Sequence, residues 1–189
     1  MRLTKLQKEV LLLTALLIVG VMIGTYYVQH RYNEYPGMIR LHVVANSDSP
    51  EDQMLKLKVR NEILKYMDGQ PDVESARAYI DEHLEEIEEI SNTVIAENGF
   101  SYTASADRRI TFIPEKSYED LTLPAGNYEA LKVTLGEGKG QNWWCVIFPQ
   151  LCLIGEDADG EKLVLKSKIK EMLQERQQEI QQEEQYEEQ

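Results

Sequence analysis

The chain has 189 residues, 42% of them hydrophobic, which is enough for one domain with a sizeable core. Its formal net charge is −13, from 33 acidic and 20 basic side chains. Because like charges repel, this balance disfavours nucleic acids and anionic membrane surfaces as partners of the body of the protein.

The first feature along the chain is an uncharged run from Val10 to Val28. As a helix rising ~1.5 Å per residue, it would reach ~28 Å, about the hydrocarbon thickness of a bilayer. Basic residues precede the run, so the positive-inside rule predicts that everything from about residue 30 onward is exported. We therefore assign 1–30 as a membrane anchor, that is, a transmembrane helix, with a cleaved signal peptide as the alternative. Residues 31–38 form a linker.

The exported domain is predicted over 39–173. Ile39–Ala45 alternates apolar and polar side chains, as does a strand with one covered face. Ser49 and Pro50 are typical of a helix N-cap and first helical position, and Gly69 ends this helix. A second, single helix is predicted from Asp72 to the Asn98-Gly99 stop signal.

Three more strands are predicted within 101–114, 128–135 and 142–148, followed by a helix from Glu161. The polar acidic tail, 174–189, is predicted to be frayed or disordered. This order indicates an α+β (mixed α/β) fold, with a small sheet of about four strands covered by two or three helices. The N-terminal hydrophobic helix precedes it.

A glycine-rich loop, "GEGKG", lies between two predicted strands at 136–140. A phosphate-binding loop would need G-x-x-x-x-G-K-[ST] opening a helix, and no Ser or Thr follows Lys139. Gly136, Gly138 and Gly140 instead predict a hairpin turn in which glycine supplies positive φ. No cofactor is expected here.

The two cysteines, Cys145 and Cys152, are separated by six residues. This spacing does not fit zinc knuckles, and the chain has no other cysteine. An even pair in an exported domain favours a disulfide, and Pro149 between them favours the necessary chain reversal. Two small buried side chains are the alternative.

Acidic and hydroxyl residues gather in "NSDSPED", with His42 on the preceding strand. A Ser47 triad lacks the surrounding G-x-S-x-G elbow, and backbone capping explains the motif without chemistry. Asp48 and Asp52 could form an acid–base pair. That pair is the basis of an alternative function, a membrane-anchored exported cell-wall hydrolase.

Trp143 and Trp144 are the only tryptophans of the chain. Adjacent strand residues point to opposite faces, so one ring is expected to enter the core while the other faces outward. An outward tryptophan on a rigid scaffold is typical of a binding hot spot. Cover by the C-terminal helix is the alternative.

Two long segments, "IRLHVVANSDSPEDQMLKLKVRNEIL" and "LPAGNYEALKVTLGEGKGQNWWCVIFPQLC", together with the N-terminal run, resemble the stage II sporulation protein R family of endospore-forming bacteria. The resemblance implies a signalling protein and not an enzyme. Such a protein is made in the forespore and exported to the space between forespore and mother cell, either anchored or released by signal cleavage. There it activates a membrane-embedded aspartic protease that processes pro-sigma-E.

On this interpretation the partners are that protease and, through the N-terminal helix, the membrane. No metal, nucleic acid or small-molecule substrate is expected. The predicted partner-binding residues are the tryptophan pair and the glycine turn first, and then Asn46 and Asp48: Trp143, Trp144, Gly136, Gly138, Gly140, Asn46 and Asp48.

Overall fold

The computed structural model describes residues 5–29, 33–67, 69, 72–118, 121–149 and 159–187. It divides into two compact units, Met1–Tyr32 and Asn33–Gln189. The first unit contains helix α1 (Lys5–Gln29), so the N-terminal helix predicted from the hydrophobic run is confirmed. The second contains all the other elements.

The transmembrane interpretation of the N-terminal run is not met. Over the residues that the structure describes, no helix has both the length and the apolar character that crossing a bilayer requires.

The centre of the second unit is a four-stranded sheet in the order β2-β5-β1-β6. The central strand β1 (Ile39–Val44) runs parallel to β5 (Gly126–Leu135) and antiparallel to β6 (Asn142–Phe148). Strand β2 (Ala104–Ile113) pairs with β5 in the antiparallel sense. A separate two-stranded sheet joins β3 (Lys116–Tyr118) to β4 (Leu121–Leu123).

This strand order overturns the predicted hairpin at the glycine loop. Strands β5 and β6 are not neighbours, because β1 lies between them. The loop from Gly136 to Gln141 therefore passes over the end of β1 instead of turning back on its own strand.

Helix α2 (Pro50–Tyr66) begins as predicted, with Ser49 as its N-cap and Pro50 at its first position. The single helix predicted after Asp72 is instead two, α3 (Val73–Glu82) and α4 (Leu84–Glu97). His83 separates them with a non-helical φ of −123°. Its ring stacks 4.1 Å from that of Tyr79, and the intact apolar spacing on either side concealed this break.

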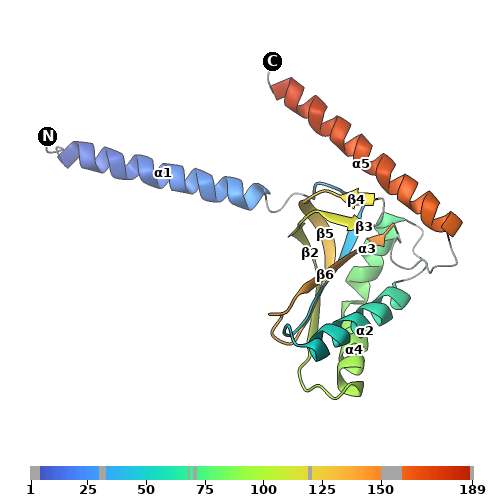
Figure 1. The fold of residues 1–189 in the computed structure, drawn as a ribbon. Coiled ribbons are helices and arrows are strands. Elements are labelled where there is room, and N and C mark those ends of the chain that lie inside the picture. The colour runs from blue at the N-terminus through green and yellow to red at the C-terminus, as the bar shows by residue number, and fades with distance from the viewer. Residues whose placement is uncertain are drawn as a thin grey trace. The chain divides into compact units, whose positions relative to one another are not determined.

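The sheet is covered on both faces (Figure 1). Helices α2, α3 and α4 pack against one face over a cluster that includes Leu41, Val59 and Leu131. The opposite face packs against the β3–β4 hairpin and α5 (Asp159–Glu187) through Ile113, Tyr128 and Ile169, among others. The predicted α+β architecture, a small sheet with helical cover, is confirmed.

Two further predictions from the sequence differ from the structure. Strand β1 was predicted to have one covered face, yet all six of its residues are buried, Arg40 and His42 included. The polar tail from 174 onward is helical as far as Glu187, where α5 ends.

Candidate functional site

Two loops meet at the edge of the sheet where the parallel strands β1 and β5 end. The loop after β1 carries Asn46 and Asp48, and the loop after β5 carries the three glycines. Backbone bonds join them: Lys139 N–H donates to the Asn46 carbonyl at 3.1 Å, and Gly140 N–H to the Ala45 carbonyl at 2.9 Å. The structure thus brings the predicted glycine turn together with Asn46 and Asp48, although Asn46 precedes Gly136 by 90 residues in the sequence.

Side chains complete this junction. The Asn46 Oδ1 atom accepts from the Glu137 N–H at 2.9 Å, and Asp48 Oδ1 accepts from the Gln141 N–H at 2.7 Å. The Nζ of Lys56 donates to the Gln141 carbonyl at 3.0 Å. Gln141 directly precedes β6, so these bonds fix the point from which the tryptophan strand starts. We call the joined segments 45–49 and 136–141 the loop junction.

The glycines of the junction have different reasons to be glycine. Gly136 and Gly138 adopt positive φ, +54° and +60°, as predicted. Gly140 does not, so the positive φ predicted for it was wrong. A Cβ on Gly140 would lie 2.2 Å from the Ser47 carbonyl oxygen, so it is the close approach of two backbones that requires glycine there.

The buried carboxylate of Asp52 stabilises the loop junction by accepting hydrogen bonds from it. Only 4% of this residue is exposed, and it accepts hydrogen bonds from Asn46 Nδ2 at 2.9 Å and Ser47 Oγ at 2.5 Å. The hydroxyl of Tyr102 also donates to it. Burial alone would raise the pKa of the carboxyl, but the bonds from Ser47, Tyr102 and Asn46 outweigh it, so the pKa lies below its ordinary value.

This environment bears on the acid–base pair considered for Asp48 and Asp52. A general acid must hold a proton near neutral pH, whereas Asp52 is stabilised as the ionised acceptor of several donors. Asp48 is exposed and bonded to the backbone of Gln141. Both carboxylates therefore serve the loop junction. Within the described ranges, no group of three His, Cys, Asp or Glu side chains is arranged to hold a metal ion.

The two tryptophans do point to opposite faces of the sheet. Trp143 packs against the helix-covered face, where the Arg60 guanidinium lies 4.6 Å from its ring centroid. Trp144 packs against the other face, stacked at 5.3 Å on His42, with the Lys116 ammonium 4.5 Å from its ring. Both are half-buried, so each ring has one side against the protein and a cation beside it.

Next to Trp143, helix α2 exposes apolar side chains. Met54 and Leu57 are 61% and 39% exposed. Met54 lies six residues before Arg60 and Leu57 three, so the three side chains form one ridge on the helix surface. Arg60 connects this ridge to the ring of Trp143. We call Met54, Leu57, Arg60 and Trp143 the α2–Trp143 surface.

Comparisons with known proteins agree with the motifs that build this region. A family model described as Stage II sporulation protein R matches residues 36–159, well over half of the chain. The chain belongs to this family. The matched residues contain the whole sheet, the loop junction and the α2–Trp143 surface. The family resemblance expected from sequence is thereby confirmed, and with it a role in sporulation.

A curated relative, Stage II sporulation protein R of Bacillus subtilis (strain 168), is 41% identical over 120 residues. The alignment covers 61% of this chain and 54% of the relative, so the chain spans about half the length of the curated protein that it matches. No solved structure matches the chain.

A row of buried polar groups on β1 was missed by sequence reasoning. Arg40 is fully buried, and its Nε donates to the Cys145 carbonyl at 2.9 Å while Nη2 donates to the Tyr118 hydroxyl at 2.8 Å. Its guanidinium lies 4.9 Å from the Tyr128 ring centroid. Burial lowers the pKa of both Arg40 and His42, which leaves the imidazole neutral at pH 7.

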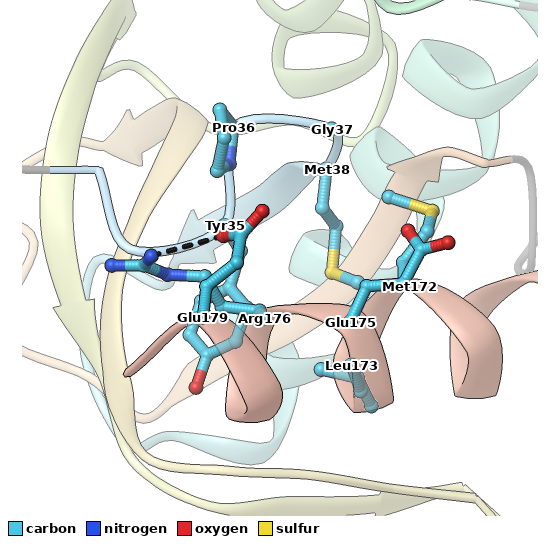
Figure 2. Close-up of a pocket in the computed structure, with 9 residues that line it drawn as sticks. All are labelled: Tyr35, Pro36, Gly37, Met38, Met172, Leu173, Glu175, Arg176 and Glu179. Atoms are coloured by element: carbon cyan, nitrogen blue, oxygen red, sulfur yellow. Dashed lines mark hydrogen bonds and ion pairs between the residues drawn. The ribbon is translucent and has the colours of Figure 1, made fainter. Parts of the chain in front are cut away.

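A small pocket lies where α5 crosses the segment that leads into β1. Its volume is about 190 Å³. Figure 2 shows its lining, which consists of residues 35–38 and one face of α5. Arg176 closes one end, donating from Nε to the Glu34 carbonyl at 2.9 Å and pairing with Glu179 at 3.1 Å. No sequence motif indicated this pocket, because it depends on how a distant helix docks.

Only one of the two cysteines of the predicted disulfide lies within the described residues. Cys145 is buried in β6, paired in register with Leu41. Cys152 lies outside the described residues, so the disulfide between the two stays a prediction.

Proposed function

We propose that this chain is an exported sporulation signalling protein that activates, by protein contact, a membrane-embedded aspartic protease processing pro-sigma-E in the mother cell. Membership of the stage II sporulation protein R family is the observation that carries the proposal. The role of its acidic residues supports a non-enzymatic mechanism, because Asp48 and Asp52 are both engaged in holding the loop junction.

The N-terminal run supports export from the forespore into the intermembrane space. It is uncharged from Val10 to Val28 and is preceded by Arg2, Lys5 and Lys8. A basic segment followed by an apolar one is the pattern that directs a chain across a membrane. In this proposal the run acts as the export signal of the domain that follows.

The α2–Trp143 surface is the part of the domain best suited to the contact. It combines a tryptophan, an arginine and two exposed apolar side chains, and hot spots of protein interfaces are enriched in the first two residue types. Met54 is more than half exposed on a helix whose opposite face packs on the sheet through Leu55, Val59 and Ile63. Burying its side chain against a partner would remove apolar area from water and so favour binding by ~25 cal/mol for each Å² buried.

The loop junction supports this surface by fixing it in advance. Residue Gln141 is tied to Asp48 and Lys56 immediately before β6 begins, and α2 begins immediately after the junction. A surface held by its own hydrogen bonds loses little conformational entropy on binding, which improves affinity. Asn46, Asp48 and the glycines then act through the position of Trp143 and need not touch the protease.

The test is processing of pro-sigma-E in sporulating cells that carry surface variants. Met54→Glu and Leu57→Glu place charge on exposed positions, so the domain should fold while processing falls at least tenfold, a loss of about 1.4 kcal/mol of contact. Tyr186→Glu is the matched control, since that ring is 84% exposed on α5, away from the family-matched residues. Wild-type processing by both α2 variants, at wild-type protein levels, would rule out this surface.

A further inference from the structure

Strand β2 is an outer strand of the sheet, so one of its two backbone edges faces away from β5. In an antiparallel pair, successive residues direct their backbone groups alternately toward and away from the neighbour. Ala104 N–H donates to Asn92 Oδ1 and Ala106 N–H to Glu88 Oε1, both at 2.7 Å. The even-numbered residues of β2 therefore point their backbone groups outward, and α4 caps the first two of them.

The remaining outward positions are Arg108, Ile110 and Phe112. In the part of the chain that the structure describes, their outward N–H and C=O groups have no hydrogen-bond partner. Phe112 is also 56% exposed, the most exposed aromatic residue described in the sheet. Open edges of this kind template pairing with another strand, and proteins usually shorten, charge or cover them. Here the cover stops at Ala106.

We propose that this open edge pairs with the same edge of a second copy of the chain, antiparallel, with Ile110 on the twofold axis. The open segment 108–112 is symmetric about Ile110, as an isologous contact requires. It is bounded on one side by Glu88 at Ala106 and on the other by Pro114, which has no N–H to pair. Pairing over this segment joins two four-stranded sheets into one of eight strands.

The side chains are complementary in this register. Ile110 lies opposite its own equivalent, an apolar pair at the axis. Arg108 lies opposite Phe112 of the second copy, and its charge is already matched by Asp81 and Glu129 within its own chain. On the other face, Arg109 lies opposite Thr111, and its charge is already matched by Asp107 in the same strand. No like charges are placed directly opposite each other.

Two helices contact strand β2 through side chains. Helix α4 does so through Asn92 and Glu88, at the end of the strand that lies beyond the paired segment, and helix α3 reaches the first residue of that segment, Arg108, through Asp81. Under twofold symmetry the two copies of α4 lie at opposite ends of the contact. After Pro114 the chain leaves the sheet for β3, which belongs to the separate hairpin.

Disulfide trapping in the full-length protein tests the register directly. In a hydrogen-bonded antiparallel pair the Cα atoms of facing residues are ~5.5 Å apart, within the range that a disulfide spans. Ile110→Cys should therefore form a covalent dimer under mild oxidation. Phe112→Cys should not, because four residues of offset separate the two copies of that position by ~14 Å.

The wild-type chain, which retains Cys145 and Cys152, gives the background of cross-linking. If two chains instead associated through helix α1, the amount of covalent dimer would be the same for Ile110→Cys and Phe112→Cys. Ile110→Lys should also reduce chemical cross-linking of the protein severalfold, because it places like charges opposite each other at the axis, whereas Ser105→Lys in the capped half should not. Equal trapping at 110 and 112, or none at either, would overturn the proposal. Absence of trapping together with lost pro-sigma-E processing in Ile110→Lys would assign the edge to a strand of another protein instead.

Discussion

Replacing Asp52 by asparagine is the sharpest perturbation of the loop junction, because it keeps the shape of the side chain and removes its charge. The carboxylate accepts bonds from Asn46, Ser47 and Tyr102. Asn46 and Ser47 share Oδ2, and Tyr102 binds Oδ1, so an asparagine oxygen can keep the first two bonds only as a neutral acceptor, and its amide N–H₂ replaces the acceptor of the third. Hydrogen bonds to charged groups contribute ~1.5–3 kcal/mol each, so weakening two of them and losing the third, partly relieved by rearrangement, should cost ~3 kcal/mol of unfolding free energy.

Urea unfolding of the full-length protein in a mild detergent, followed by tryptophan fluorescence, measures this cost. Asp48→Asn is the matched control: that side chain is exposed and accepts a single backbone N–H, which an amide oxygen can also accept. The control should lose less than ~1 kcal/mol. If Asp52→Asn reduced the free energy of unfolding no more than Asp48→Asn, the Asp52 carboxylate would not stabilise the loop junction as its hydrogen bonds indicate.

The pH dependence gives a second reading of the same variant. The pKa of Asp52 is lowered in the folded protein, so its contribution to stability is complete above the unfolded value of ~3.9 and is lost as pH falls through the folded value. The stability difference between wild type and Asp52→Asn should therefore be constant near neutrality and shrink below about pH 4.

Three other perturbations test the structure elsewhere. Gly140→Ala should cost ~2 kcal/mol or more in the same urea assay, because the new methyl would overlap the Ser47 carbonyl; a neutral effect would show that the two loops are not in close contact. Glu129→Gln should cost ~3 kcal/mol, since this buried carboxylate pairs with Arg77 at 2.8 Å and Arg108 at 2.5 Å, and an unchanged midpoint would contradict those pairs. Because burial lowers the pKa of His42 below 6.5, stability should fall as pH drops below that value, and His42→Gln should flatten the fall; an identical slope in the variant would contradict a buried neutral imidazole.

Local signals in the sequence predicted the elements well. The Ser49-Pro50 start of α2 rests on one side chain capping an N–H three residues away, and that interaction needs no tertiary context. The opposite directions of Trp143 and Trp144 follow from strand geometry alone. The functional family was also accessible, because long motifs around both loops are matched by its members.

Long-range contacts were not accessible in the same way. Tyr102 meets Asp52 across fifty residues of sequence, and nothing in either local pattern links them. The burial of Arg40 follows from cover on both faces of β1, including aromatic rings that come from β3 and β5. The hairpin prediction at 136–140 failed because strand order decides whether a glycine loop turns back or crosses a neighbouring strand.

The most direct test of the central proposal is reconstitution in a host that does not sporulate. This chain, the membrane-embedded aspartic protease and pro-sigma-E are expressed together, with export of the chain verified, and the cleaved fraction of pro-sigma-E is measured with and without the chain. Activation by contact predicts cleavage that depends on the chain and falls with Met54→Glu. Equal cleavage in its absence, or none when all three proteins are present at comparable levels, would contradict the account.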